Sequence, residues 1–245
     1  MAALTTRLGR TRAVLIGGLL AAALPAAAST FNLAPIRLEM DRSRQTGVLT
    51  LHNDGDAPVT IQVRPVSWSQ PEGADRYEPT QDLIVTPPVF VVAAHKDQIV
   101  RVARRGATDG ERERTYRLFF EEVPDAAPAG FNGLKVALRI GIPVFFAAPA
   151  AKPDLAFSAR WNADGTLELS AQNKGLAHFQ ITDFELSAPD ATQVAKVGGS
   201  RYVLGGSETH WSLTPAPGTG RAEHLRISGH GDGGAIAADV AVTAP

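Results

Sequence analysis

The feature that most constrains the fold of this chain is a succession of short segments in which apolar and polar residues alternate. Residues 49–52 alternate in this way and run into a turn signal at 53–56, and residues 59–66 alternate again. Such alternation is typical of a strand with one buried face. No long apolar pattern of helical period follows the N-terminal region. The sequence therefore predicts an all-β protein, and a spacing of about 8–12 residues between strands favours a sandwich or barrel.

The candidate strands fall into two groups on either side of a short proline-containing stretch. Residues 147–153 read Ala-Ala-Pro-Ala-Ala-Lys-Pro, and each proline favours extended backbone in the residue before it. This composition is typical of a linker. We therefore predict two domains, residues 29–148 and 149–245, each of the usual size of an immunoglobulin-like β-sandwich. Further candidate strands cover residues 83–85, 89–92, 98–102, 116–123 and 134–146 before the linker, and 155–162, 167–172, 179–186, 202–204, 209–213, 224–227 and 235–242 after it.

The N-terminus has the three parts of a secretory signal peptide. Arg7, Arg10 and Arg12 precede an apolar run at residues 13–24, and small residues follow up to Ala28. We predict that residues 1–28 are removed on export and that the mature chain has no membrane span. The alternative is an uncleaved anchor, but the apolar run is shorter than the roughly 20 residues that cross a bilayer.

The amino-acid composition argues against several classes of function. The chain has no cysteine, so an exported fold must be held by its hydrophobic core without disulfides. Thiol chemistry and cysteine metal sites are excluded for the same reason. The formal net charge of −1 gives no basic excess to hold a polyanion, which argues against a nucleic-acid partner.

Three patterns that could carry chemistry have simpler interpretations. Glu121 and Glu122 are adjacent, and neighbours in a strand point to opposite faces, so they cannot flank one bond. The six histidines show no ligand spacing, and we predict no metal site. Residues 229–234 formally fit a dinucleotide-binding fingerprint, but a strand follows them where a helix is needed, so we expect a hairpin turn. We predict neither an enzyme nor a cofactor.

The long strand predicted at residues 134–146 has an unusually extended apolar face. Its even positions are all apolar, and they are Leu134, Val136, Leu138, Ile140, Ile142, Val144 and Phe146. This length far exceeds the usual 5–6 residues or so, and such a face requires a partner along its whole length. Two interpretations remain open. The segment is either a core strand that continues into the linker, or a strand that lends part of its apolar face to another protein.

Several stretches, in the correct order, resemble segments of a known family. Residues 116–124 read Tyr-Arg-Leu-Phe-Phe-Glu-Glu-Val-Pro and follow Glu113. The other segments are Thr-Pro-Pro at 86–88, Gln-Ile-Val-Arg-Val at 98–102, Arg-Ile-Gly-Ile-Pro-Val-Phe at 139–145 and Asn-Lys-Gly-Leu-Ala-His-Phe at 173–179. Together they resemble the PapD-like periplasmic chaperones of chaperone–usher pilus assembly. The amino-acid sequence of residues 139–145 most resembles that of the archaic branch, which serves spore-coat-U-like pilins.

The resemblance implies two immunoglobulin-like β-sandwich domains joined at an angle, with a cleft between them. It also implies a periplasmic chaperone that binds pilin subunits and delivers them to an outer-membrane usher. In this family the pilin lacks the last strand of its own sandwich, and a chaperone strand fills the groove by donor-strand complementation. The donor residues here would be Leu134, Val136, Leu138 and Ile140.

The family also holds the C-terminal carboxylate of the subunit with two cations in the cleft. The first falls on Arg37. The second falls near residues 141–143, where this chain has no cation, and Arg139 is the nearest substitute. The resemblance therefore leaves three arrangements open: Arg37 alone, Arg37 with Arg139, or a different register.

The alternative function is a secreted carbohydrate-binding or adhesive β-sandwich. Such a module would present an exposed aromatic platform, for which Trp68, Trp161 and Trp211 are the tryptophans available. A periplasmic hydrolase is a third class, but it would need a catalytic constellation that is not visible in the sequence.

Overall fold

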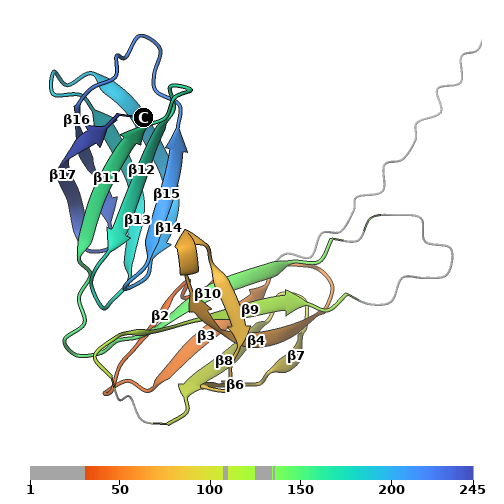
Figure 1. Cartoon of the computed structure of the whole chain (residues 1–245). Helices are drawn as coiled ribbons and strands as arrows, with labels where there is room; N and C mark the ends of the chain where they lie inside the picture. Colours follow the sequence, from red (N-terminus) through yellow and green to blue (C-terminus); the bar gives the residue numbers. More distant parts are fainter. Residues whose placement is uncertain (1–30, 107–109, 125–133, 135, 245) are drawn as a thin grey trace, which may run out of the picture.

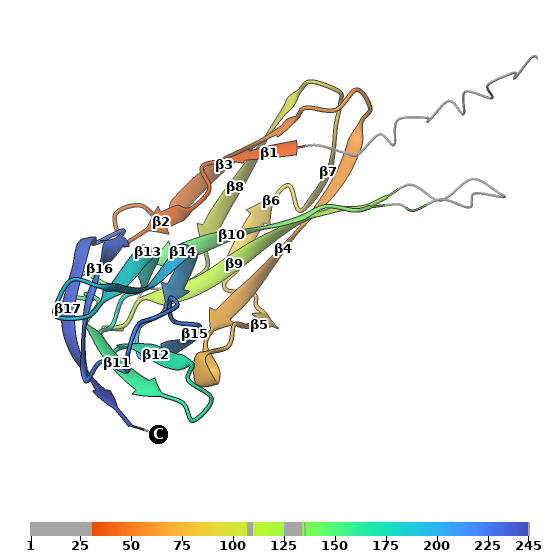
Figure 2. The ribbon, with the colours of Figure 1, turned by 90° about the horizontal axis from the view of Figure 1, so that it is seen from above.

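The computed structural model describes residues 31–106, 110–124, 134 and 136–244, and their regular secondary structure is almost entirely β-strand (Figure 1). Strands β1 to β10 form one body and β11 to β17 a second, set at an angle to the first (Figures 1 and 2). The prediction of an all-β chain with two immunoglobulin-like sandwiches is confirmed. The predicted signal peptide, residues 1–28, lies outside the described residues. No described helix is long and apolar enough to cross a membrane.

The first body is a sandwich of two sheets. One has the strand order β1-β3-β8-β6, and the other has the order β2-β10-β9-β4-β5 with β7 beside β4. Leu51 and Val100 of the first sheet share one fully buried core with Leu118 and Val144 of the second. The strands are β1 Phe31–Ala34, β2 Leu38–Met40, β3 Thr46–Asn53, β4 Val59–Ser69, β5 Arg76–Pro79, β6 Leu83–Thr86, β7 Val89–Val92, β8 Asp97–Arg104, β9 Arg114–Glu122 and β10 Arg139–Phe146, with a 3₁₀ turn at Pro71–Gly73.

The second body follows one continuous strand order, β14-β13-β16-β17-β11-β12-β15, in which β11 and β17 pair in parallel. Leu167, Leu169, Ile181 and Ile227 lie in its core and are almost completely buried. The strands are β11 Leu155–Trp161, β12 Leu167–Asn173, β13 Phe179–Ser187, β14 Gln193–Val203, β15 Glu208–Leu213, β16 His224–Gly231 and β17 Gly234–Thr243.

The glycine-rich segment at 229–234 is a hairpin turn, as the sequence predicts, because β16 ends at Gly231 and β17 begins at Gly234. Its glycines permit close packing against β13. A Cβ atom at Gly229 would lie 2.2 Å from the Asp183 carbonyl oxygen, and one at Gly231 would lie 2.2 Å from the Phe179 ring.

Several strands were missed or predicted only in part, and β1 and β2 were not among the predicted strands. β14 covers Gln193–Val203, whereas the sequence indicated only residues 202–204. The reason is Gly198-Gly199-Ser200, which is typical of a turn but lies here inside the strand, where the pairing with β13 shifts register. β5 was missed because Arg76–Pro79 carries little apolar signal.

The same buried asparagine turn occurs once in each sandwich. The side-chain amides of Asn53 and Asn173 donate to carbonyl groups and accept from the backbone N–H of the glycine two residues later, Gly55 and Gly175. Asn173 also accepts from the backbone N–H of Asp154, which ties the linker to the second sandwich. A Cβ at Gly175 would lie 2.2 Å from the Lys152 carbonyl oxygen, so only glycine fits there.

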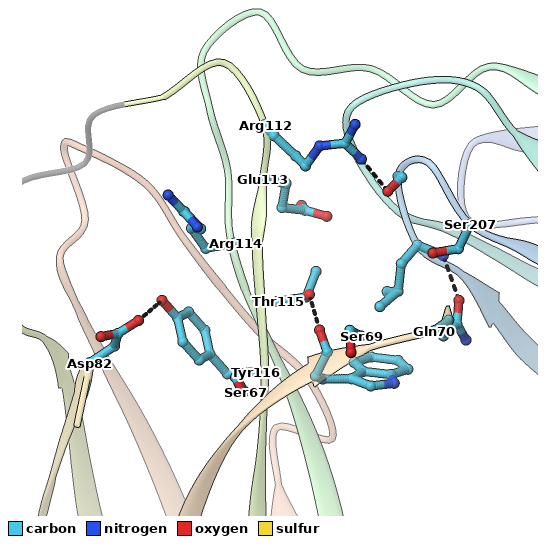
Figure 3. A pocket seen from close by; sticks show the side chains of 13 residues that line it. Ser67, Ser69, Gln70, Asp82, Arg112, Glu113, Arg114, Thr115, Tyr116 and Ser207 are labelled. Carbon is cyan, nitrogen blue, oxygen red and sulfur yellow. Dashed lines mark hydrogen bonds between the residues drawn. The ribbon is translucent and has the colours of Figure 1, made fainter. Parts of the chain in front are cut away.

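The two sandwiches meet at an aromatic cluster with hydrogen bonds around it. Trp68 and Phe145 of the first body bury Leu204 of the second. The Gln70 side chain accepts from the Leu204 N–H at 2.9 Å and donates to the Tyr202 carbonyl at 3.0 Å. Figure 3 shows this part of the junction, including the bond from Arg112 to the backbone of the second body. These contacts hold the second sandwich at one end of the first.

His178 adds a buried charge to this junction. Its ring stacks on Phe145 with 3.4 Å between centroids, and its Nδ1 lies 2.8 Å from a Glu113 carboxylate oxygen. Its Nε2 lies 3.4 Å from Asp232. Burial opposes the charged form, but the hydrogen bonds to Asp232 and Glu113 outweigh it and raise the pKa of His178 to about 9. The imidazolium therefore pairs with Glu113 across the junction and with Asp232 of its own sandwich.

Replacing Asn173 with Ala is expected to lower the free energy of unfolding of the second sandwich by about 2–4 kcal/mol. The substitution removes four hydrogen bonds and leaves buried backbone groups without partners. Asn162→Ala is the control, because it removes one side-chain bond in a surface hairpin. Urea denaturation measures the free energy of unfolding of both variants. An Asn173→Ala protein as stable as the control would contradict the role assigned to this turn.

The stability of the junction should fall at alkaline pH. The folded-state pKa of His178 lies above its ordinary value of 6.5, so its stabilisation is complete below about pH 6.5 and is lost as pH rises through about 9. The loss is on the order of 3 kcal/mol. Urea denaturation at pH 6.5 and 9.5 should show it for the native chain and much less of it for His178→Gln. An equal pH dependence in both proteins would refute the assignment.

Candidate functional site: the open edge of β10 and the cleft

β10 has one edge that is only partly covered. On one side it pairs with β9 over its whole length, from Arg139 opposite Glu121 to Phe146 opposite Arg114. On the other side β2 pairs in parallel with the last three residues alone, 144–146. Among the described residues, 139–143 therefore have no partner strand on that side. Unpaired backbone N–H and C=O groups along such an edge can accept another strand.

The predicted donor residues emerge progressively from the core of the first sandwich. Ile140 and Leu138 are partly buried against this core, whereas Val136 is 63% exposed and Leu134 is 87% exposed. Beyond them, Ile142, Val144 and Phe146 are fully buried. The interpretation as a core strand therefore holds for one part of the long apolar face, and donation of the other part to another protein stays a prediction. One end builds the core, and the other end presents apolar side chains to solvent.

The strand itself is shorter than predicted, since β10 begins at Arg139 and not at residue 134. The reason is its neighbour: β9 ends at Glu122, whose N–H donates to the Leu138 carbonyl at 2.9 Å. Leu134 and Val136 lie beyond the last residue of β9, and Leu138 lies beside that residue but outside the assigned strand. Lys135 lies outside the described residues. Figure 2 shows β9 and β10 running side by side toward this end.

Arg139 lies on the outer face of the sheet and is already paired. Its Nε is 2.9 Å from Glu121 Oε1, and the Arg64 guanidinium is 2.8 Å from the same oxygen. Both guanidinium groups lie over the Phe119 ring, with Arg139 at 3.7 Å. The hydrogen bond from Arg64 is the main reason that the pKa of Glu121 is lowered. Glu122 contacts the Leu138 N–H instead, so the two adjacent glutamates do not act together.

Arg37 lies in the cleft and bridges the sandwiches. Its guanidinium is 2.8 Å from Glu39 of the first sandwich, and it donates to Asp232 at 3.0 Å and Gln180 at 3.1 Å in the second. Burial opposes its charge, but Glu39, Tyr202 and Asp232 together keep the pKa of Arg37 above its ordinary value. Asp232 has a lowered pKa despite its burial, because His178 and the Gln180 N–H bond to it.

The structure does not bring Arg37 and Arg139 together. Leu38, the residue after Arg37, is the partner of Val144, which lies five positions along β10 from Arg139. At about 3.3 Å per residue the two arginines are separated by roughly 15 Å along the strand. The anchor formed by this pair stays a prediction.

The cleft contains a further arginine that sequence reasoning missed. Arg117 of β9 lies beside a cavity of about 450 Å³, which is lined from the first sandwich by Trp68 and Asp75 and from the second by Tyr202 and Arg201. A second cavity of about 300 Å³ adjoins Arg37 and His178. The available signal was the alternation of β9, which puts Arg117 on the same face as Phe119 and Glu121.

Three side chains of the second sandwich are arranged as serine, histidine and carboxylate, which is the order of a hydrolytic triad. Ser170 Oγ is 2.7 Å from His210 Nδ1, and His210 Nε2 is 3.4 Å from Glu208. The residues lie on neighbouring strands with the His210 and Glu208 side chains 40% and 44% exposed. A hydrolase needs oxyanion donors in a site from which water is excluded, and these exposures leave the group in water.

All three tryptophans, Trp68, Trp161 and Trp211, are buried.

Comparison with solved structures identifies chaperones of the same architecture. A CsuC–CsuE chaperone–tip subunit complex from archaic Csu pili of Acinetobacter baumannii has a TM-score of 0.63 at 21% identity, covering 88% of this chain and 99% of that one. The E. coli chaperone DraB has a TM-score of 0.58 at 18% identity, covering 87% and 97%. The SafB chaperone in complex with SafA pilin of Salmonella enterica has a TM-score of 0.57 at 15% identity, covering 86% and 94%.

The family comparison agrees with the likeness in fold. No curated protein matched the sequence. A family model described as the pili and flagellar-assembly chaperone, PapD N-terminal domain, matches residues 30–152, which is half of the chain. The resemblance noted in the sequence is thereby confirmed, and the chain belongs to the PapD-like family of pilus-assembly chaperones.

Proposed function

We propose that this protein is a periplasmic chaperone that stabilises pilin subunits by donor-strand complementation and delivers them to an outer-membrane usher. Family membership supports the chaperone role, and two of the similar structures are of chaperones bound to a pilin or a tip subunit. The observation that carries the proposal is the exposure of Leu134 and Val136 next to the open edge at residues 139–143.

The open edge and the apolar side chains act together in this mechanism. A strand added beside residues 139–143 would complete the backbone hydrogen bonds of β10, which provides affinity. The alternate side chains Leu134, Val136, Leu138 and Ile140 would enter the groove of the subunit, which provides selectivity. Burying an exposed Leu or Val side chain contributes about 1.5–3 kcal/mol, so the two most exposed residues could supply several kcal/mol to the complex.

The rest of β10 holds this donor segment in place. Ile142, Val144 and Phe146 are fixed in the core of the first sandwich, and β9 pairs with residues 139–146. The donor segment is therefore the continuation of a rigid strand and needs less ordering on binding than a free peptide does.

Export and the partners complete the proposal. Residues 1–28 would direct the chain to the periplasm, and the usher would receive the loaded chaperone.

For the subunit carboxylate, Arg37 is the proposed cation in the cleft, whereas the guanidinium of Arg139 is held by Glu121 and Phe119. The carbohydrate-binding alternative gains no support, because its three candidate tryptophans are buried.

Introducing carboxylates on the exposed donor residues should abolish subunit capture. In Leu134→Asp/Val136→Asp, each carboxylate would be buried without a partner in the complex, at a cost of several kcal/mol. Both positions are exposed in the free chain, so its folding should be unaffected. Co-expression with the cognate pilin and co-purification measure the loss, which should exceed tenfold.

The matched control is Val48→Asp/Ile99→Asp. It introduces the same charges at two exposed apolar residues, 50% and 45% accessible, on the other sheet of the first sandwich. This protein should capture the pilin as the native chain does. Undiminished capture by the Leu134→Asp/Val136→Asp protein would refute the proposed mechanism.

A further inference from the structure

The open edge of β10 presents the backbone of its odd-numbered residues. The Glu122 N–H donates to the Leu138 carbonyl at 2.9 Å, so the backbone groups of the even-numbered residues face β9. Successive residues of an antiparallel strand alternate in this respect. The N–H and C=O groups of Arg139 and Gly141 therefore point to the open side, whereas Pro143, the next odd residue, has no N–H. Arg139 and Gly141 thus carry most of the hydrogen-bonding capacity of this edge.

Gly141 is the weak point of the edge. A glycine has no side chain to pack and has more conformational freedom than other residues, so it weakens a strand. Close packing explains why a glycine is present here. A Cβ at position 141 would lie 3.0 Å from Phe119 Cε1 and 3.1 Å from Arg117 Cδ. The Phe119 ring occupies the space that a side chain at 141 would need.

Phe119 lies directly opposite Gly141 on β9. Its ring is only 8% exposed, although it lies on the outer face of the sheet and outside the core of the first sandwich. Tyr77 meets the ring edge-on with 5.2 Å between centroids, and the Arg139 guanidinium covers it at 3.7 Å from the centroid. An aromatic ring that covers a cross-strand glycine compensates for the missing side chain.

Glu121 keeps Arg139 over this ring. One carboxylate oxygen of Glu121 lies 2.9 Å from Arg139 Nε and 2.8 Å from the Arg64 guanidinium, which is itself 5.7 Å from the Phe119 centroid. These side chains lie on the face of the sheet opposite to Ile140 and the other predicted donor residues, because side chains alternate along a strand. They stay outside the groove of a subunit and act on it through the backbone of β10.

We propose that Phe119, held by Arg139 and Tyr77, is a positioning residue that keeps the backbone of Gly141 in strand geometry before a subunit arrives. The inference rests on the proposed function, since it concerns the edge to which the subunit would bind. A backbone that is already ordered loses less conformational freedom on binding, which increases affinity. Arg139 then has a role in strand addition that does not require contact with the subunit.

The first test needs no subunit. The ¹⁵N relaxation of the Gly141 amide is measured in the mature native chain, in Phe119→Ala and in Phe157→Ala. The last is the matched control, because it removes a partly buried ring from the second sandwich. We expect an order parameter of about 0.85 for Gly141 in the native chain and the control, and below about 0.6 in Phe119→Ala. An unchanged order parameter in Phe119→Ala would overturn the proposal.

The second test measures subunit capture by competition. Native and variant chaperones with different affinity tags are co-expressed with a limiting amount of the cognate pilin, and the pilin bound to each is compared. Phe119→Ala should hold about tenfold less pilin than the native chain, because the glycine backbone must now be ordered on binding. Phe157→Ala should hold as much as the native chain. The thermal unfolding midpoint of each variant separates lost binding from lost folding.

A compensating substitution distinguishes positioning from general stability. Gly141→Val in the Phe119→Ala background places a β-branched side chain, which favours strand geometry, in the space that the ring leaves. The double variant should recover both the order parameter at residue 141 and the capture of pilin. Ordering of residue 141 without recovery of capture would overturn the proposal, as would native capture by Phe119→Ala.

The positioning role and the proposed function fail in different ways. Unchanged capture by Leu134→Asp/Val136→Asp refutes strand donation. Loss of capture by that variant together with native capture by Phe119→Ala refutes only the role of Phe119.

Discussion

The pairing of β10 with β9 is the interaction on which the rest of this structure depends, because β10 continues an apolar face beyond the strand that supports it. From Ile142 onward that face fills the core of the first sandwich. Toward Leu134 the same face leaves the core, since β9 ends at Glu122. A single strand therefore belongs to the interior at one end and to the surface at the other. In our proposal, the exposed end is completed by a subunit that lacks a strand.

The second sandwich limits where such a subunit can extend. Gln70 and the pair Glu113–His178 hold it at the end of the first sandwich. β2 covers β10 from Val144 onward, so the open edge stops at the cleft. The charges that orient the sandwiches, Arg37 and Asp232 among them, thus border the place where an added strand must end. One group of residues serves both the junction and the proposed carboxylate site.

Much of the fold could be predicted from the sequence because alternation records one-sided burial. β4 and β9 were found in this way, and the apolar even positions of β10 indicated the extended face before any contact was known. Most of β14 was missed because a Gly-Gly-Ser sequence resembles a turn, and its strand pairing depends on β13. The start of β10 was misplaced because alternation cannot show where the partner strand ends.

The site was less predictable than the fold. The extended apolar face follows from periodicity, whereas its predicted role as a donor and the role of Arg37 follow from family resemblance. The surroundings of Arg117 do not follow from either, since Trp68, Tyr77 and Tyr202 approach it from distant parts of the chain. The engagement of Arg139 by Glu121 is likewise a cross-strand contact that only the register reveals.

Amide hydrogen exchange of residues 136–142, measured in the free chaperone and in its complex with the pilin, tests the central claim most directly. The account predicts rapid exchange in the free protein at Val136 and at amides on the open side of 139–142. It predicts strong protection of the same amides in the complex, because a new strand would accept their hydrogen bonds. Amides that exchange equally fast in both states would show that the subunit binds elsewhere and would contradict strand donation by β10.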